Sequence, residues 1–569
     1  MSILNFPRVP SRLATHAAVS LRIELALLAL IHFAALAIFY ATEWGELHCA
    51  LALLTWGFLN FTWLAILRRP LLSAVLSLIM IVALIALSQF KFDILWTGLS
   101  FFDFLIVDHD TVSYLMAIIP HLRLAALASV VVAVPVLFAI WRFDPFRIRR
   151  RVAALGAAAC LAGVGALSAA VPQEIWESFQ GVNHTSNFFR SGVTEISELV
   201  THGLFAADTE AAPRLNPAAD QTCRPAQKPP HIIMLLDESS FDITAAPGIK
   251  VPPNYRSHFR SFDGAARSLL VEGSGGPTWY TEYNVLTGLS VRSFGRFQFY
   301  VTRIAAGRVE RGLPRALARC GYKTLTLFPS SGAFLNARRF QETTGIERFI
   351  DQNEMGAPDE QQPDSFYLDQ ALRTIDREKG SAPLFMFAYV TANHFPWTLT
   401  YRPDLTPDWR GLGNEPSVDE YLRRQSMSAR DYRGFLAHLE QEFPGESFLI
   451  VRFGDHQPAL SARIIDPAAD SAAIAARFAA YDPRYFTTYY AIDTVNFTPV
   501  ELSSALPRLD AVYLPLVIQE AAGLPLDASF AEQKKILVRC RGLFYTCGHG
   551  HEARRFNRLL IDVGLIKQL

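Results

Sequence analysis

The sequence predicts five transmembrane helices followed by an external α/β domain with a mostly parallel central sheet. Three observations lead to this prediction. The chain has 569 residues, which is too long for one ordinary hydrophobic core. Its hydrophobic content is 51%, and the excess lies almost wholly before residue 172. After residue 231, apolar runs that suit buried strands alternate with segments that suit helices.

Five N-terminal segments are apolar over nearly the ~20 residues that a helix needs to cross a bilayer. They are residues 21–40, 48–67, 71–90, 124–141 and 153–171, within a predicted transmembrane domain of residues 1–171. In lipid, such segments are expected to be helices because unpaired backbone groups find no water there. Buried helices of a soluble protein are the alternative, which five successive segments disfavour.

Basic residues set the predicted orientation of these helices. Cations precede the first segment (Arg8, Arg12, Arg22), separate the second from the third (Arg68, Arg69) and separate the fourth from the fifth (Arg142, Arg147, Arg149, Arg150, Arg151). The other two connections carry few cations. The positive-inside rule therefore places the N-terminus in the cytoplasm and everything after Val171 outside. The first segment lacks a small-residue cleavage site, so we expect it to be retained.

The remaining chain divides into connections and one external domain. The aromatic connection Lys91–His121 is expected to lie at the outer membrane boundary. Within residues 172–230, the sequence predicts an amphipathic helix between Trp176 and Phe205 and a linker at Ala206–Pro230. The external domain, residues 231–569, is predicted to have strands at Ile232–Leu236, 322–328, 383–391 and 447–455, and helices at Gly312–Cys320, Ser365–Glu378 and Ser428–Phe443.

Charge and cysteine content narrow the class of protein. Lys+Arg and Asp+Glu are equal at 53 each, and no long block of like charge occurs, so nucleic-acid binding is not expected. Four cysteines fall in the external part, an even number that allows two disulfides. Cys223–Cys320 and Cys540–Cys547 are the expected pairs, and four free buried thiols are the alternative.

Polar residues follow the predicted strands at the sheet edge where open parallel sheets bind ligands. Asp237 and Glu238 follow the first strand, Asn393 and His394 follow PLFMFAYVT, and Asp455 and His456 follow SFLIVRFG. The loop GSGGPTWYTEY at residues 273–283 adds Thr278 and Thr281. Carboxylates and imidazole suit Zn²⁺ or Mn²⁺, and a hydroxyl beside such a metal becomes a nucleophile.

Five motifs together resemble a known family. They are MLLDESSFD, GGPTWYTEYNVLTGL, FLNARRFQETTGIERFID, NHFPW and FGDHQP, in this order. This series resembles the sulfatase-like membrane phosphotransferases of the alkaline phosphatase superfamily, which are lipoteichoic acid synthases and phosphoglycerol and phosphoethanolamine transferases. The resemblance covers essentially the whole chain, most firmly residues 231–526, and implies a sulfatase-like (alkaline phosphatase-like) fold for the external domain. Each motif alone is weak, whereas their order and strand context are specific.

The resemblance also implies roles for single residues. Glu238, Thr278, Asp455 and His456 match the ligands of one divalent metal, Mn²⁺ or Zn²⁺, with Mg²⁺ less favoured. Thr278 matches the nucleophile as well, and His394 matches a histidine that contacts the phosphate or assists the leaving group. Asp237 and Thr281 stay open as the competing ligand and the competing nucleophile.

Some positions depart from the family pattern. Leu335 and Ala337 stand where lipoteichoic acid synthases have a Trp and an Arg near the substrate. Arg338 or Arg339 could bind the phosphate instead, by a bidentate contact, and solvated charges on a helix face are the equal alternative. GGPTWY lacks the C/S-x-P-x-R pattern of true sulfatases, which disfavours sulfate-ester hydrolysis. For Cys547, His549 and His551, a surface loop is favoured over a second metal site.

The resemblance implies a function at the bacterial cytoplasmic (inner) membrane, with the catalytic domain periplasmic or extracellular. The expected reaction transfers a phosphoglycerol headgroup from phosphatidylglycerol to a glycan or similar acceptor through a phosphothreonine intermediate. A phosphoethanolamine transferase acting on a glycan or lipid A is one alternative. A non-catalytic lipid sensor or regulator with the same fold is another. Variable loops such as Tyr401–Asp419 are expected to recognise the acceptor, and their shape does not follow from the sequence.

Overall fold

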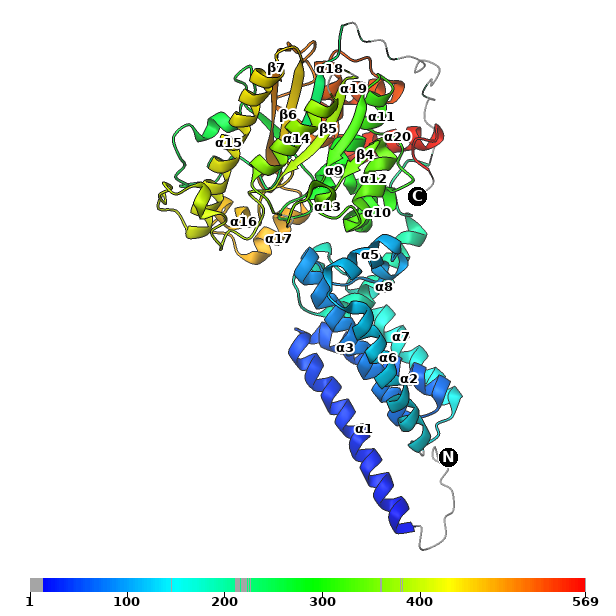
Figure 1. The fold of residues 1–569 in the computed structure, drawn as a ribbon. Coiled ribbons are helices and arrows are strands. Elements are labelled where there is room, and N and C mark those ends of the chain that lie inside the picture. The colour runs from blue at the N-terminus through cyan, green and yellow to red at the C-terminus, as the bar shows by residue number, and fades with distance from the viewer. Residues whose placement is uncertain are drawn as a thin grey trace. The chain divides into compact units, whose positions relative to one another are not determined.

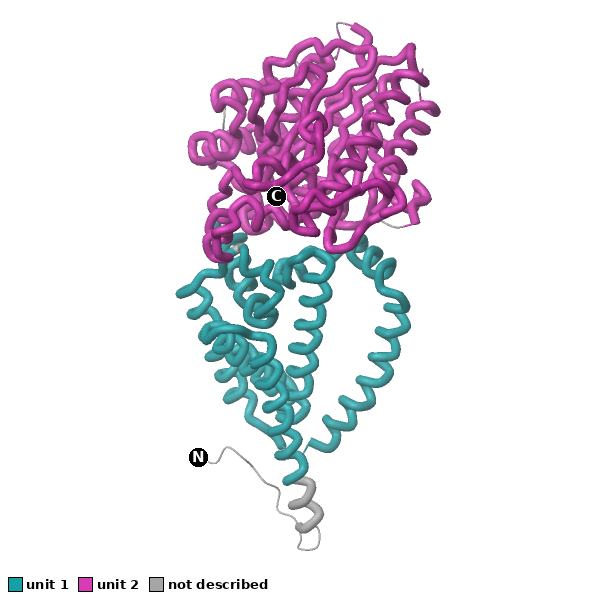
Figure 2. Tube along the Cα trace, turned by 90° about the vertical axis from the view of Figure 1, so that its left-hand side faces the viewer, with its two compact units in different colours: residues 1–202 teal, residues 203–569 magenta. Residues whose placement is uncertain are grey.

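The computed structural model of this chain describes residues 14–144, 146–209, 215, 223, 225, 227–358, 361–378, 380 and 382–567. The chain divides into two compact units, Met1–His202 and Gly203–Leu569 (Figure 2). Arg8, Arg12 and much of the predicted linker lie outside the described residues.

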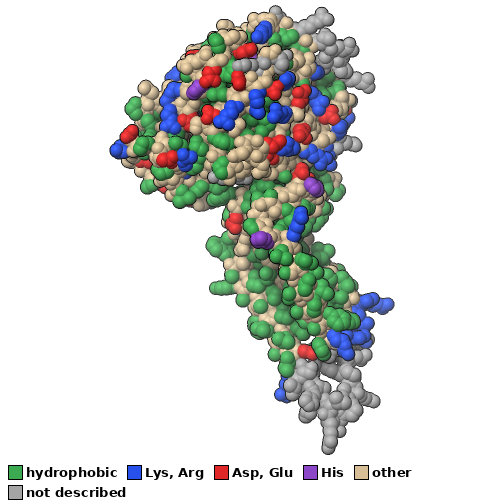
Figure 3. Space-filling view, viewed as in Figure 1, with side chains coloured by type: hydrophobic (Ala, Val, Ile, Leu, Met, Phe, Trp, Pro, Cys, Tyr) green, Lys and Arg blue, Asp and Glu red, His purple; other side chains and the backbone are tan. Residues whose placement is uncertain are grey.

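The first unit is helical (Figure 1). Its helices are α1 (Ala14–Thr42), α2 (Glu46–Leu67), α3 (Pro70–Leu95), α4 (Phe101–Leu105), α5 (His109–Ile118), α6 (Leu122–Phe143), α7 (Arg150–Ala170) and α8 (His184–Thr201). In the part of the chain that the structure describes, five helices are long and apolar enough to cross a membrane, namely α1, α2, α3, α6 and α7. The five predicted helices are thereby confirmed. Hydrophobic side chains cover much of their visible surface (Figure 3).

The connection after α3 is more ordered than the sequence suggested. It contains α4 and α5, and each helix begins with a capping side chain. The backbone N–H of Ser100 donates to Asp103, and the N–H of Thr111 donates to Asp108 at 3.0 Å. Capping groups satisfy the free N–H groups of a helical first turn, which stabilises even short helices.

Helix α8 covers the later part of the predicted amphipathic segment and packs within the first unit. Glu43, at the loop after α1, is 3% exposed. It accepts hydrogen bonds from the N–H of Thr185 at 2.9 Å and the hydroxyl of Ser186 at 2.5 Å. These contacts hold the start of α8 against the ends of α1 and α2.

The second unit is built on an eight-stranded sheet of order β4-β3-β5-β1-β6-β7-β2-β8. The strands are β1 (His231–Asp237), β2 (Arg267–Leu270), β3 (Lys323–Leu327), β4 (Arg348–Ile350), β5 (Leu384–Val390), β6 (Phe448–Gly454), β7 (Thr487–Val495) and β8 (Arg508–Asp510). Strand β7 runs antiparallel to β6 and β2, and the other pairs are parallel. The predicted mostly parallel sheet is confirmed, and its four predicted strands are β1, β3, β5 and β6.

Helices pack around this sheet. They are α9 (Thr278–Thr287), α10 (Val301–Ala305), α11 (Leu313–Ala318), α12 (Ala337–Thr344), α13 (Gln352–Met355), α14 (Asp364–Glu378), α15 (Pro416–Glu442), α16 (Ser461–Ile465), α17 (Ser471–Ala479), α18 (Leu514–Ala521), α19 (Ala528–Cys540) and α20 (His551–Asp562). The helices predicted from the sequence correspond to α11, α14 and α15. Helix α15 begins at Pro416, whereas the sequence predicted a start at Ser428. The prediction missed the first turns because they bury the charged residues Glu420, Arg423 and Arg424 instead of an apolar stripe.

The centre of the sheet is buried on both faces, which explains the long apolar runs in its sequence. Every residue of β1, β5 and β6 is buried. Ile233 and Leu235 of β1 pack with Tyr367 of α14 and Leu439 of α15. Since β1 lies between β5 and β6 and all three are parallel, their carboxyl ends meet at one edge of the sheet.

Both expected disulfides are present in the second unit, Cys223–Cys320 and Cys540–Cys547. Cys49 and Cys160, in the first unit, are free. The alternative of four free external thiols is therefore wrong.

Candidate functional site

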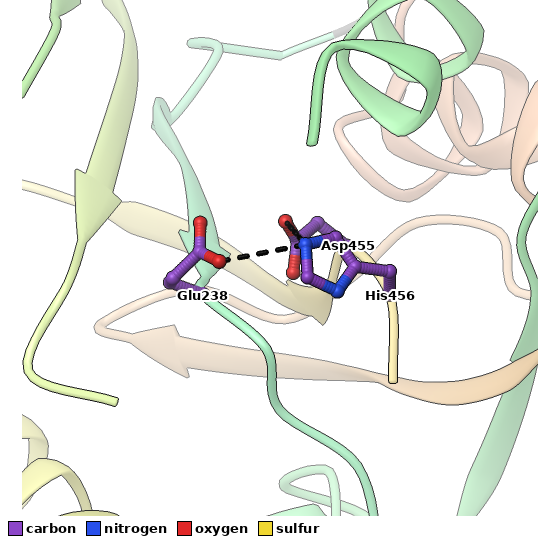
Figure 4. A group of neighbouring side chains, drawn as sticks. All are labelled: Glu238, Asp455 and His456. Carbon is purple, nitrogen blue, oxygen red and sulfur yellow. Dashed lines mark ion pairs between the residues drawn. The ribbon is translucent and has the colours of Figure 1, made fainter. Parts of the chain in front are cut away.

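Three predicted metal ligands converge at the carboxyl ends of β1 and β6. Glu238 directly follows β1, and Asp455 and His456 directly follow β6, with Asp237 paired to Gly454 in register. One ligand atom from each residue lies within 4.8 Å of the others (Figure 4). Nε2 of His456 is 3.5 Å from Oε1 of Glu238 and 3.2 Å from Oδ2 of Asp455. All three side chains are buried. We call these three residues the ligand trio.

The trio fits a divalent cation. Oδ2 of Asp455 is buried and has no hydrogen-bond donor among the described residues, an arrangement that is costly for a carboxylate. Nδ1 of His456 lies 3.0 Å from the carbonyl oxygen of Gln457, so a proton there leaves the Nε2 lone pair facing the carboxylates. Two carboxylates and an imidazole suit Zn²⁺ or Mn²⁺.

The electrostatics of the trio agree with this assignment. Burial and the charge of Glu238 raise the pKa of Asp455 to about 7, against the opposing effect of His456. Burial favours neutral His456, yet the charges of Asp455 and Glu238 outweigh it and raise the pKa of the imidazole. The two carboxylates therefore repel each other and retain a proton nearby. A bound cation would supply the positive charge that this proton supplies otherwise.

Thr278 lies beside the trio as the first residue of α9. Its hydroxyl donates to Oε2 of Glu238 at 3.2 Å and lies 3.4 Å from Nε2 of His456. The loop before it turns through Gly275 and Gly276, whose φ angles of 80° and 154° favour glycine. The start of a helix carries a partial positive charge, so an anionic group at Thr278 would be stabilised.

The two competing residues point elsewhere. The hydroxyl of Thr281 donates to the backbone carbonyl of Asp455, and this side chain is fully buried. Asp237 accepts hydrogen bonds from the hydroxyl of Tyr489 at 2.6 Å and from Nε2 of His258 at 3.1 Å. Successive residues of a strand face opposite sides, which separates Asp237 from Glu238. These contacts favour Thr278 and Glu238 over their neighbours.

His394 follows β5, so it lies at the same edge of the sheet as the trio. Its Nδ1 is 3.0 Å from the carbonyl oxygen of Phe395, and its ring stacks on the Phe395 ring at 4.4 Å. A proton on Nδ1 would leave Nε2 as the nitrogen that can accept a proton. The loop of His394 is separate from those that carry the trio.

Among the described residues, neither predicted phosphate-binding arginine forms a hydrogen bond or an ion pair with the trio. Arg338 pairs with Asp351 at 3.2 Å and Glu354 at 2.7 Å, and it donates to the carbonyl of Phe349 at 2.8 Å. Arg339 is exposed on α12. The binding roles of both residues stay predictions.

The late GHGHEARRF stretch is not the surface loop that the sequence predicted, because Cys547–Gly550 form a 3-10 turn and α20 begins at His551. Its contacts do not favour a second metal site either. Cys547 is joined to Cys540, so it offers no thiolate. His549 and His551 are exposed. Among the described residues, the ligand trio is the single group with metal-ligand spacing.

Ser239 is a site residue that the sequence did not reveal. Its N–H donates to Oδ1 of Asp455 at 2.8 Å, and its hydroxyl donates to Oε1 of Glu238 at 2.9 Å. It thus holds both carboxylates, from a left-handed backbone conformation with φ of 52°. Serine rarely adopts this conformation, so only the tertiary contacts explain it. The one signal in the sequence is a hydroxyl residue next to Glu238.

In a comparison with known protein families, residues 269–487 match the Sulfatase family model. A Rhizobium meliloti (strain 1021) protein provisionally named for cyclic beta-1,2-glucan modification is 26% identical over 243 residues, which cover 41% of this chain and 36% of that protein. The chain thus spans about a third of that relative's length.

Solved structures are similar at low identity. The Streptococcus pyogenes phosphoglycerol transferase GacH, in complex with sn-glycerol-1-phosphate, has 18% identity and a TM-score of 0.45, covering 62% of this chain and 87% of its own. The lipoteichoic acid synthase LtaP of Listeria monocytogenes has 15% identity and a TM-score of 0.37, covering 58% and 78%. The Neisseria meningitidis phosphoethanolamine transferase EptA has 11% identity and a TM-score of 0.37, covering 73% and 83%.

Proposed function

Residues 269–487 match the Sulfatase family model, in agreement with the motif series, and from this match we propose that the chain is a metal-dependent phospho-group transferase. One observation carries the proposal. The hydroxyl of Thr278 contacts both Glu238 and His456, so a nucleophile and a set of metal-ligating atoms share one buried edge of the sheet. A non-catalytic sensor would have no need to keep this combination.

The proposed metal ligands are Glu238, Asp455 and His456, with Thr278 completing the set. A divalent cation bound there would lower the pKa of the Thr278 hydroxyl and offset negative charge on the phosphate. Ser239 would keep both carboxylates in place through its two hydrogen bonds. Gln457 would keep Nε2 of His456 directed at the site.

In the first step, Oγ1 of Thr278 attacks the phosphorus of a phospholipid headgroup. A bond forms between this oxygen and phosphorus, and the bond from phosphorus to the diacylglycerol oxygen breaks. The proton of the hydroxyl ends on the departing diacylglycerol, and the headgroup is left as a phosphothreonine. The helical N-terminus at Thr278 stabilises negative charge that spreads over the other phosphate oxygens.

In the second step, an acceptor hydroxyl attacks the same phosphorus. The bond to Oγ1 of Thr278 breaks, the headgroup passes to the acceptor, and the proton of the acceptor hydroxyl ends on Oγ1, which restores the free threonine. His394 would take the acceptor's proton, because its Nε2 is the nitrogen that can accept one when Nδ1 faces Phe395. Arg338 or Arg339 would contact the phosphate only after a change from the contacts described above.

We take phosphatidylglycerol as the donor and an extracytoplasmic glycan as the acceptor. The choice of donor rests on the motifs after Thr278 and at Asn393-His394. The name of the Rhizobium meliloti relative supports a glycan acceptor. The five apolar helices would tether the domain beside its lipid donor, with the N-terminus in the cytoplasm and the second unit outside the inner membrane.

The test uses the full-length protein in vesicles that contain phosphatidylglycerol and Mn²⁺. We expect diacylglycerol release and a modified peptide that contains Thr278, with an added mass equal to phosphoglycerol. Thr278→Ala should abolish both signals, whereas Thr281→Ser, a matched change on the same helix that keeps its hydroxyl, should retain them. Absence of both signals from the wild-type protein would refute the proposal that the chain is a phospho-group transferase.

The same assay separates the alternative donor. With vesicles of phosphatidylethanolamine, a phosphoethanolamine transferase would add that headgroup to Thr278 and release diacylglycerol. A wild-type protein that reacts only with these vesicles would overturn the proposed donor while leaving the proposed chemistry intact.

A further inference from the structure

One buried arginine of α15 holds the loop that carries His394. Arg424 is 1% exposed. Its Nη1 donates to the carbonyl oxygen of His394 at 2.6 Å, and its Nη2 donates to those of Pro396 and Leu399, each at 2.8 Å. One guanidinium therefore binds three backbone carbonyls of a six-residue stretch of loop.

Glu420, one helical turn earlier, fixes the direction of this guanidinium. Its Oε1 accepts from Nε of Arg424 at 2.6 Å and from the N–H of Tyr401 at 2.9 Å. The pair is almost sealed from solvent, with Glu420 8% exposed. A planar guanidinium can reach separate acceptors along fixed directions, whereas the point charge of a lysine cannot reproduce this geometry.

Arg423 serves the neighbouring part of the loop. Its Nε donates to Oε2 of Glu420 at 2.8 Å, and its Nη1 donates to the hydroxyl of Thr406 at 2.5 Å. Its Nη2 donates to the carbonyl of Tyr401. Arg423 is as buried as Arg424, at 3% exposed, and shares the same glutamate. The two residues thus differ in which stretch they hold, residues 394–399 or residues 401–406.

The imidazole of His394 is oriented by its own loop. Nδ1 faces the carbonyl of Phe395, and the ring stacks on that residue. Gln361 adds a second hydrogen bond to the His394 carbonyl at 3.1 Å, beside the one from Arg424. A shift of the backbone at His394 would therefore carry the ring with it.

We infer that Arg424 is a positioning residue for His394, and that it sets the distance between this imidazole and the phosphate at Thr278. The inference rests on the proposed function. Arg424 itself touches no reacting atom, so its effect must pass through the loop. A misplacement of about 1 Å in a catalytic group can cost about 10²-fold in rate.

The test is a double-mutant cycle in the vesicle assay, with full-length protein, phosphatidylglycerol, Mn²⁺ and free glycerol as the acceptor whose hydroxyl proton His394 would take. Steady-state release of diacylglycerol, which requires both steps, gives kcat. Arg424→Lys should lower kcat by about 10²-fold and leave the KM for lipid and the bound metal unchanged. Arg423→Lys, the matched control, should stay within a few-fold of wild type. The Arg424→Lys/His394→Gln double variant should be no slower than His394→Gln alone, because Arg424 acts through His394.

The inference would be overturned if the fold-loss of kcat in the double variant equalled the product of the two single losses, since Arg424 would then act independently of His394. Thermal unfolding and metal content report whether Arg424→Lys has folded. If it has not, Glu420→Gln provides the second variant and should show a smaller loss of kcat that again disappears in the His394→Gln background. Failure of both variants to fold would overturn the inference in favour of a purely structural role.

The outcomes also separate this inference from the proposed function. A wild-type protein that forms no phosphothreonine would refute the function. An active wild type together with a fully active His394→Gln variant would refute the role of Arg424 alone.

Discussion

Replacing Gly454 by alanine should disrupt the proposed metal centre, because Gly454 lies in the sheet directly before one of its ligands. Gly454 ends β6 and directly precedes Asp455. A Cβ at this position would lie 1.8 Å from the carbonyl oxygen of Ser240 and 3.2 Å from Cβ of Thr488. The obstructing oxygen belongs to the backbone just after Glu238 and Ser239, so no rotation of a side chain relieves the overlap. Alanine must therefore push apart the two segments that bring the ligand trio together.

The size of the effect follows from this overlap. Carbon and carbonyl oxygen approach to about 3.3 Å in close contacts, so the backbone must separate by about 1.5 Å. Overpacking of a core usually costs about 1–3 kcal/mol, and we expect the upper end, about 3 kcal/mol, because backbone must move. The same shift would spread the trio and weaken metal binding by at least about 10-fold.

Thermal unfolding of the second unit and titration with Mn²⁺ or Zn²⁺ measure both effects. Gly434→Ala is the matched control, because Gly434 lies inside α15 and an added Cβ meets no atom within 4 Å. Alanine in a helix interior should stabilise the protein by about 0.5–1 kcal/mol. If Gly454→Ala loses less than about 1 kcal/mol and binds metal like the wild type, the close approach of β6 to Ser240 is wrong.

Three further predictions concern pH, metal and disulfides. Burial and the charge of Glu272 raise the pKa of Asp510 from 3.8 to about 7. Because the folded value is the higher one, the protein loses stability as pH rises from about 4 to about 7. Asp510→Asn should therefore stabilise it by up to about 4 kcal/mol at pH 8 and by little at pH 4 in denaturant titrations, and an equal gain at both pH values would contradict this. Chelation of a bound cation should lower the stability of the second unit by about 2.7 kcal/mol relative to protein held at 100 times Kd, whereas Asp455→Asn should not respond to the chelator. Cys320→Ser opens a loop with a sequence separation of 97, and Cys547→Ser opens one with a separation of 7. The free energy of unfolding should therefore fall by about 4.7 kcal/mol in the first variant and by about 2.5 kcal/mol in the second. The reverse order in unfolding experiments would refute the chain-entropy reasoning.

Much of the sheet could be predicted because buried parallel strands read as continuous apolar runs. This was true of β1, β3, β5 and β6. Strand β7 escaped prediction because TTYYAIDTV mixes polar and apolar residues, and its antiparallel pairing with β6 and β2 depends on partners far along the chain. The short strands β4 and β8, with three residues each, have no periodicity to detect.

Helix α15 shows a second limit of sequence patterns. A helix is usually recognised by an apolar stripe that faces the core. The first turns of α15 instead bury Glu420, Arg423 and Arg424. Both arginines pair with Glu420 and donate to loop carbonyls. Charged residues at core positions therefore hid the start of the helix, and the residues we infer to position His394 were concealed for the same reason.

At the candidate site, the sequence could name the ligand trio because acids and a histidine directly follow buried strands. It favoured Glu238 over Asp237 through the family resemblance, whereas the face of the sheet that each residue occupies could not be read from the sequence. Nor could it reveal that Arg338 is paired with Asp351 and Glu354. Pairing of this kind is a tertiary property that spacing along the chain does not encode.

The pairing of β1 with β6 also determines when the proposed metal centre can form. The hydrogen bond from the N–H of Ser239 to Asp455 joins residues that are 216 positions apart in the sequence. Strand β1 gains its two neighbours only after both β5 and β6 have been synthesised. Contacts of such long sequence separation form slowly, because loop closure must precede them. Glu238 therefore lacks its partner ligands during most of the synthesis of the second unit. A cation at the proposed site would therefore bind late, after β6 has paired with β1.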